Sequence, residues 1–275
     1  MSERVSSEGR SSLAERRRRS SRRLFIWSGV LLCVLFGIFV YSMWQSSMRI
    51  SRVVIYGADQ SLAGVAIAAL QGSYLGIVPR DSTFFISESR IRSSIMATSH
   101  DIAAVSIFRN GLTGLSIKID YRVPIARWCG ALPVASSTPV TDCYFFDANG
   151  FVYATTTDDM SPVNAFIVYE PLAHEGGLTS LNSIGNTLPH ADKFPAAFNF
   201  ARQLTTLGSP AESVVFRGDE VDDYLKSGTR ITYVLGNEQN AFTALASARA
   251  NLNLANGSID YIDLRFPGKV YLKKK

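Results

Sequence analysis

The sequence predicts one membrane-spanning helix followed by an α+β exterior. Three observations support this fold class: an uncharged apolar run at residues 24–44, mixed strand-like and helix-like segments at 45–123, and mainly strand-like segments at 124–275. We expect a β-α-α-β-β unit and then a mainly antiparallel β domain with two helices. Residues 1–23 form a basic tail ahead of the span.

The predicted span is residues 24–44. A helix of this length rises about 30 Å, which matches the hydrocarbon core of a bilayer. The run ends with Tyr41, Met43 and Trp44, an aromatic boundary typical of a membrane interface. A cleaved signal peptide is the competing interpretation, but its apolar run is shorter and ends in a small-x-small site. The sequence therefore favours an uncleaved anchor in contact with lipid.

Charge predicts the orientation of this anchor. The tail holds eight arginines, and six of them lie just before the span: Arg16, Arg17, Arg18, Arg19, Arg22 and Arg23. Positive residues beside a span stay in the cytoplasm, so we expect a cytoplasmic N-terminus and an exterior C-terminus in the inner membrane. The whole chain has 28 basic and 23 acidic residues, and the tail contains eight of the basic and three of the acidic ones. The remainder is neutral, which argues against nucleic acid as a partner.

The first exterior unit is predicted from short periodic segments. A strand is expected at 50–56, helices at 62–70 and 87–96, and strands at 102–108 and 115–123. Ser87 is the expected N-cap of the second helix. The last strand alternates, and we expect Leu115, Ile117, Ile119, Tyr121 and Val123 to share its buried face.

The second unit is predicted to be mainly β. Strands are expected at 125–128, 144–146, 151–153, 166–169, 213–217 and 229–235, and helices at 195–207 and 239–254. Asp147-Ala148-Asn149-Gly150 is a hairpin signal between two of these strands. Residues 158–193 are rich in loop-forming residues and are expected to form long loops.

The last predicted strand or hairpin is at the C-terminal end. Residues 259–266 alternate, Pro267-Gly268 predicts a turn, and Lys269-Val270-Tyr271-Leu272 leads into three lysines. Proline and lysine are typical of a sheet edge protected from uncontrolled pairing. The same free edge can accept a strand from a partner.

Cys129 and Cys143 flank a loop rich in Pro and Ser. Under the predicted topology both lie in a compartment where disulfides persist, so a cross-link is expected, with two free thiols as the alternative. Closing a loop of this size contributes roughly 3 kcal/mol in the chain-entropy account.

Catalytic and cofactor patterns are missing from the sequence. The three histidines, His100, His174 and His190, have no HExxH spacing, and no GxSxG, SxxK, P-loop or GxGxxG sequence is present. The acidic pairs Asp158-Asp159 and Asp222-Asp223 are interpreted as solvated loop residues. We therefore expect a binding protein without catalytic, cofactor or metal residues.

Five segments, taken in order, are typical of one protein family. They are Val53-Val54-Ile55-Tyr56-Gly57, Val105-Ser106-Ile107-Phe108-Arg109, Val123-Pro124-Ile125-Ala126-Arg127-Trp128, Asp147-Ala148-Asn149-Gly150 and Ile262-Asp263-Leu264-Arg265-Phe266. Together they resemble the FtsQ/DivIB family of bacterial cell-division proteins. The resemblance covers the whole chain, including the basic tail and the anchor. It implies that residues 45–123 form a POTRA-like domain and residues 124–275 the β domain of that family.

The resemblance implies a scaffold at the division septum. Family members bind two other one-pass division proteins, FtsB and FtsL, partly through the terminal edge of the β domain, and link them to septal wall synthesis. The matching residues here are Arg265, Phe266, Val270, Tyr271 and Leu272, with ordinary sheet closure as the alternative role. A second contact is expected on Arg109 and residues 115–123.

Two positions differ from the family pattern. Gly111-Leu112-Thr113-Gly114 stands where a proline turn is common, and Tyr121 stands where an acidic residue is common. An anchored POTRA-type adaptor or transport component is the alternative function, although the strands of an outer-membrane barrel are missing from the sequence. An anchored cell-wall enzyme is the third alternative.

Overall fold

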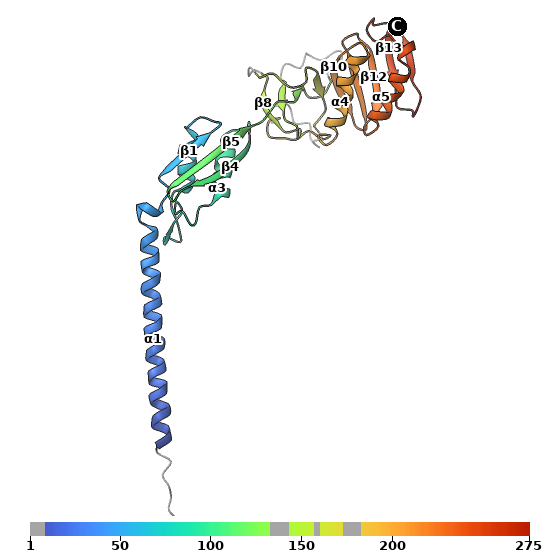
Figure 1. The fold of residues 1–275 in the computed structure, drawn as a ribbon. Helices are drawn as coiled ribbons and strands as arrows, with labels where there is room; N and C mark the ends of the chain where they lie inside the picture. The colour runs from blue at the N-terminus through green and yellow to red at the C-terminus, as the bar shows by residue number, and fades with distance from the viewer. Residues whose placement is uncertain (1–8, 133–142, 157–159, 173–182) are drawn as a thin grey trace, which may run out of the picture. The chain divides into compact units, whose positions relative to one another are not determined.

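The computed structural model describes residues 9–132, 143–156, 160–172 and 183–275 (Figure 1). Contacts divide the chain into two compact units, one of Met1–Thr98 with Ala104–Asp120 and the other of Ser99–Ala103 with Tyr121–Lys275. His174, the pair Asp158-Asp159 and much of the predicted loop region 158–193 lie outside the described residues.

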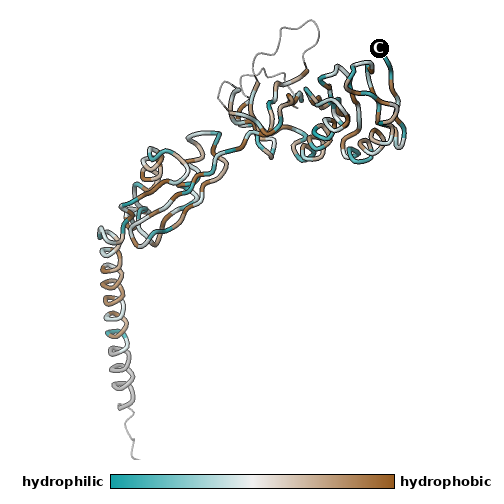
Figure 2. The backbone as a smooth tube through the Cα atoms, turned by 45° about the horizontal axis from the view of Figure 1, so that its top comes forward, coloured by the Kyte–Doolittle hydropathy of each residue, from teal (hydrophilic) through white to brown (hydrophobic). Residues whose placement is uncertain are grey.

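Unit 1 begins with helix α1, Gly9–Met43, which extends through the basic segment into the apolar run. Its part from Ser21 to Met43 is long and apolar enough to cross a membrane, and its most apolar window is not buried against the rest of the chain. Figure 2 shows this part of α1 mostly in brown, the colour of apolar residues. Leu24, Phe25, Leu31 and Leu32 are exposed examples. A core helix of a soluble protein would bury such side chains, so this part of α1 is a candidate membrane span.

The rest of unit 1 is a small mixed layer. Strand β1, Arg52–Tyr56, is followed by helices α2, Leu62–Leu70, and α3, Glu88–Met96, and by strands β4, Ile102–Asn110, and β5, Gly114–Tyr121. Strand β5 lies between β1 and β4 and is parallel to β1. The buried apolar side chains come from both layers: Val53, Ile55, Ala66, Leu70, Ile91, Ile95, Leu115, Ile117 and Ile119.

Three details of this unit differ from the sequence prediction. Strand β5 ends at Tyr121, and Tyr121 and Val123 are exposed because the chain leaves the sheet there. Ser87 occupies the N-cap position of α3, but its hydroxyl contacts Ser89 Oγ and caps no backbone N–H. A two-stranded hairpin of β2, Ser73–Tyr74, and β3, Val78–Pro79, stands where only chain breaks were predicted.

Unit 2 is built on a nine-stranded sheet. The strands are β6 Ala126–Trp128, β7 Tyr144–Phe146, β8 Val152–Thr155, β9 Ile167–Tyr169, β10 Ala211–Arg217, β11 Glu220–Leu225, β12 Arg230–Val234, β13 Ile259–Asp263 and β14 Tyr271–Lys274. Their order is β14-β13-β12-β11-β10-β9-β6-β7-β8, with β8 and β14 at the ends. The sheet is mixed, because the β6–β9, β9–β10 and β12–β13 pairs are parallel.

Two helices cover this sheet. Helix α4, Phe194–Leu204, packs on β10, and α5, Glu238–Ser247, packs on β12, and the helices contact each other (Figure 1). Short 3-10 turns follow each helix, at Thr205–Leu207 and Arg249–Asn251. The shared core is rich in aromatic side chains, among them Phe146, Phe194, Phe198, Phe200 and Tyr233.

Strand β11 corrects the sequence prediction. Asp222 and Asp223 were interpreted as solvated loop residues, but they lie in the middle of β11 and are 2% and 0% exposed. Val221 and Leu225 are in the core, and the period of a strand places Asp223 on their face and Asp222 on the opposite one. Two adjacent acidic residues are typical of a loop, so the apolar residues beside them were not recognised as part of a strand.

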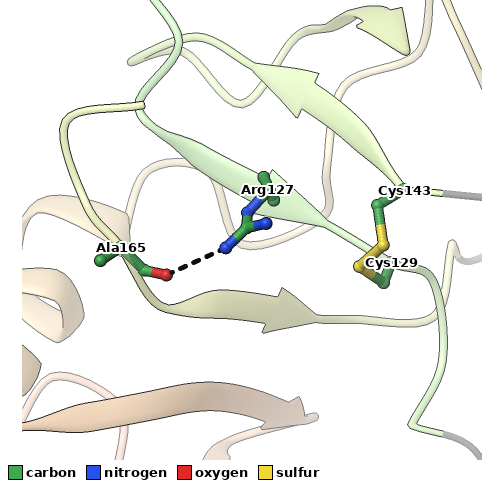
Figure 3. The surroundings of a disulfide bond; sticks show 4 residues. All are labelled: Arg127, Cys129, Cys143 and Ala165. Carbon is green, nitrogen blue, oxygen red and sulfur yellow. Dashed lines mark hydrogen bonds between the residues drawn. A yellow bond between two sulfur atoms is a disulfide. The ribbon is translucent and has the colours of Figure 1, made fainter. Parts of the chain in front are cut away.

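The two cysteines join the start of unit 2 into a closed loop. Cys129 follows β6, Cys143 precedes β7, and Figure 3 shows their sulfurs bonded, with a sequence separation of 14. The adjacent strands β6 and β7 pair antiparallel, which brings the two Cα atoms to 4.3 Å. Arg127, in β6 just before Cys129, donates from Nη2 to the Ala165 carbonyl at 3.4 Å. The cross-link therefore reinforces an existing strand pair.

Candidate partner-binding edge

The C-terminal hairpin of β13 and β14 forms one end of the nine-stranded sheet. Ile259, Ile262 and Leu264 are buried in the core of unit 2 and fix the position of β13. The Lys269 amide donates to the Phe266 carbonyl at 3.1 Å, and Gly268 has a φ of +69°, so Pro267-Gly268 forms the predicted turn. Strand β14 then pairs antiparallel with β13 from Asp263↔Tyr271 to Ile259↔Lys274.

All four residues of β14 are exposed. Since β13 pairs with only one side of β14 and β14 ends the strand order, its other side is the free edge of the sheet. Register places Leu272 opposite the core residue Ile262, so Leu272 is on the helix-covered face. Tyr271 is on the opposite face.

Exposed apolar side chains gather at the start of this edge. Phe266, Tyr271 and Leu272 are 51%, 48% and 41% exposed. The Phe266 and Tyr271 rings meet edge to face at 5.3 Å between centroids. Exposed aromatic pairs of this kind are typical anchors of protein interfaces.

Arg265 is bonded within the chain. Its guanidinium donates to Asp263 through Nε at 3.0 Å and Nη2 at 2.6 Å, and to Glu220 Oε1 through Nη1 at 2.8 Å. The bonds from Arg265 lower the pKa of Asp263, and the same carboxylates raise the pKa of Arg265. Its donors are therefore engaged within the chain, tying the turn to β11. Val270 also faces inward, since it packs against the core.

Lysines surround the exposed apolar residues. Lys273 forms an ion pair with Asp260 at 3.0 Å, while Lys269 and Lys274 are exposed with no acidic partner among the described residues. A basic rim disfavours pairing with a second copy of the same edge and favours an acidic segment.

The second predicted contact surface is not a free edge. Strand β5 is central in its sheet, and Leu115, Ile117 and Ile119 are buried. Its opposite face is polar, with Lys118 paired to Asp120 at 2.8 Å. Arg109 is exposed near the end of β4 and can contact a partner. Residues 115–121 could contact a partner only through side chains, because both sides of β5 are already paired in the sheet.

Two buried groups were missed by sequence reasoning. Glu170 is 1% exposed and accepts from the His190 amide at 3.1 Å and from the ring Nδ1, while its second carboxylate oxygen has no partner. Burial raises the pKa of Glu170, and His190 partly opposes that shift. The His190 ring stacks on Phe216 at 6.0 Å between centroids. No local sequence pattern connects residues this far apart, so only the fold shows the pair.

Asp223 is the second such group. Neither of its carboxylate oxygens has a hydrogen-bond partner among the described residues. Burial, followed by the charge of Asp222, raises its pKa well above the ordinary value. Asp222 differs because Arg217 Nε binds it at 2.7 Å and Thr232 donates at 2.5 Å. Apolar Val221 and Leu225 on either side were the sequence signal that these carboxyls lie in a strand.

No cluster of three or more His, Cys, Asp or Glu side chains in the described part of the chain is arranged to hold a metal ion. One helix able to span a membrane, followed by mixed α/β structure rich in strands, defines the class of this protein as far as fold allows. No family model matches the sequence, and no curated protein matches it significantly.

Proposed function

We propose that this chain is a non-enzymatic scaffold of the bacterial divisome, of the FtsQ/DivIB kind, anchored once in the cytoplasmic membrane. The free edge at β14 carries the proposal. It combines unpaired backbone, exposed Phe266, Tyr271 and Leu272, and a basic rim at the place where the family binds a partner strand.

The segments that carry the resemblance occupy ordered positions. Val53 to Tyr56 lie in β1, Val105 to Arg109 in β4, and Asp147 to Gly150 form a turn in which the Asp147 carboxylate accepts from the Asn149 and Phe151 amides. Ile262 and Asp263 end β13, and Arg265 and Phe266 lead into the turn at Pro267-Gly268. This agreement between motif and structure supports the proposal.

The proposed mechanism is strand addition. A segment of an FtsB-like or FtsL-like one-pass protein pairs with the outer side of β14 through backbone hydrogen bonds. Tyr271 and Leu272, on opposite faces, give side-chain selectivity, and Lys269 and Lys274 attract acidic residues of the partner. Arg265 contributes indirectly by holding the turn against Glu220 and Asp263.

The test uses the full chain, purified in detergent, and measures capture of FtsB-like and FtsL-like proteins from the same organism. Tyr271→Lys and deletion of residues 268–275 are expected to weaken capture. Val163→Lys is the matched control, because Val163 is also exposed and apolar in unit 2 but lies away from the hairpin. Equal capture by Tyr271→Lys and Val163→Lys would reject docking at this edge.

Topology and cell biology separate this function from its rivals. A reporter that works only outside the cytoplasm should be active after Lys275, as the arginine asymmetry requires. Depletion should give filaments with unsplit septa. A normal division pattern after depletion favours the anchored adaptor or transport function instead.

A further inference from the structure

Several exposed apolar side chains of unit 1 adjoin the end of the predicted span. They come from the segment after α1, the β2–β3 hairpin, the following loop and the β4–β5 turn. We call them the apolar tips: Trp44, Leu75, Ile77, Phe84, Phe85 and Leu112. Their exposed fractions run from 43% for Ile77 to 95% for Leu75.

Hydrogen bonds hold these segments together. Trp44 Nε1 donates to the Ile77 carbonyl at 2.8 Å, which attaches the β2–β3 hairpin to the residue after α1. The Thr83 amide donates to the Met48 carbonyl at 3.0 Å, and the Thr83 hydroxyl donates to the carbonyls of Met48 and Leu112. The tips therefore belong to segments bonded directly to one another or to the chain that leaves the span.

Leu75 has a backbone conformation that its side chain does not favour. It has a φ of +52°, next to Gly76 at +75°, and the Ile77 amide donates to the Tyr74 carbonyl to close the turn. Turns with two positive φ values prefer Asn, Asp or Gly. A leucine there is strained, and it is also the most exposed large apolar residue of the chain outside the masked segments. Folding alone gives no reason for leucine at this position.

We infer that the apolar tips insert into the bilayer interface beside the C-terminal end of α1, so that unit 1 contacts the lipid surface in addition to being tethered to it. A lipid surface fits better than a protein partner because one tip, Trp44, directly follows α1, and its indole is bonded to a second tip, Ile77. Trp44 belongs to a residue type enriched at the headgroup level. Arg80, stacked at 5.4 Å over Tyr74, adds a cation near the same hairpin for lipid phosphates.

This inference rests on the anchoring part of the proposed function. The experiment uses full-length protein in phospholipid vesicles that carry doxyl quenchers on their acyl chains near the headgroups. Cys33, the free cysteine, is first replaced by Ser, so that only an introduced cysteine reacts with an environment-sensitive fluorophore. Single cysteines are placed at Leu75, at Leu35 in the span and at Val163 in unit 2.

The Leu75 probe is expected to be quenched several-fold more than the Val163 probe, and the Leu35 probe is expected to be quenched as well. Quenching at Leu35 with none at Leu75 overturns the inference while anchoring stands. An unquenched Leu35 probe defeats anchoring itself, and the inference with it. A Leu75 probe that responds only after a partner protein is added also overturns the inference, since it assigns the tips to a protein contact.

A second variant separates lipid contact from folding. Leu75→Asn suits the turn, because Asn tolerates positive φ, and removes the apolar tip. With a probe at Phe84, this variant should show weaker quenching while its thermal midpoint stays equal or rises. Unchanged quenching at Phe84 would contradict a shared lipid contact of the two tips.

Discussion

The two ends of the nine-stranded sheet are finished in different ways. At the β8 end, residues 183–190, which we call the strap, run along the start of the strand. The Val152 amide donates to Asn186 and the Gly185 amide donates to Val152, both at 2.8 Å, and Leu188 donates to Gly150 at 2.9 Å. At the β14 end no strand or strap of the described chain covers the outer side.

This difference shows which end is structural. The strap buries Leu188 at 2% exposure and fixes its own end through the His190–Glu170 contact. The β14 end leaves Tyr271 and Leu272 in solvent. Proteins usually protect exposed sheet edges, so the contrast between the two ends supports the docking proposed for β14.

Removing the buried leucine of the strap is the strongest way to break this comparison. Leu188→Ala is expected to lower the free energy of unfolding by about 2–5 kcal/mol, because it leaves a cavity in the core. Urea unfolding measures the loss, and hydrogen exchange at the Val152 and Gly185 amides should speed up. Leu272→Ala is the control at the open end, with a change within about 0.5 kcal/mol. Equal costs at the two positions would remove the distinction.

The His190–Glu170 contact is the next target. His190→Ala leaves a buried carboxylate with fewer partners and is expected to cost about 1–3 kcal/mol. The cost of His190→Ala should be smaller in a Glu170→Gln background, because no buried carboxylate is then left without its partner. Urea unfolding of the wild type, the two single variants and the double variant measures this coupling. Additive losses would mean that the His190–Glu170 contact does not hold the strap.

Asp223 lies in β11, an interior strand of the sheet, and serves as a reference away from both ends. Because the pKa of Asp223 is raised in the folded state, folding favours its protonated form. The contribution of protonated Asp223 to the free energy of unfolding is complete below the ordinary carboxyl pKa. As the pH rises from the unfolded-state pKa to the folded-state pKa, this contribution declines by about 1.4 kcal/mol per pH unit. Asp223→Asn should remove this decline, as measured by unfolding between pH 4 and 8.

Asp219→Asn is the control for that measurement, because Asp219 is an exposed residue in the turn before β11. It should keep the wild-type dependence on pH. If Asp223→Asn keeps the same dependence, Asp223 is ionised in the folded protein.

Tyr271→Lys should have the smallest effect on stability. An exposed edge residue changes the free energy of unfolding by no more than about 0.5 kcal/mol, while the same change weakens partner capture. Thermal unfolding beside the capture assay tests both halves. A large loss of stability would show that β14 closes the sheet as a structural strand and would make reduced capture uninformative.

Regular periodic segments were predictable from the sequence. The helix at 62–70 has the predicted bounds, and the C-terminal hairpin turns at Pro267-Gly268 as expected. Local apolar spacing and turn chemistry determine such elements. The open edge followed from the same pattern because lysines and proline are local signals.

The predictions that failed concern residues whose surroundings are set by contacts with residues far away in the sequence. Asp222 and Asp223 are polar by type, and only Arg217, Thr232 and the overlying helices explain their burial in β11. Alternation continued past Tyr121 in the sequence, but the sheet ends there. The pairing of Arg265 with Glu220, 45 residues earlier, was not predicted because it leaves no local sequence pattern.

The strand order also defines a route for mechanical load. The chain enters the sheet at β6, and a partner held at β14 would pull from the opposite end across β9, β10, β11, β12 and β13. Tension between the anchor and the partner must therefore pass through successive hydrogen-bonded ladders. The Cys129–Cys143 disulfide links the ends of β6 and β7, the strands with which the chain enters this sheet. Under the proposed function, the sheet would therefore carry force between the membrane anchor and the strand that binds β14.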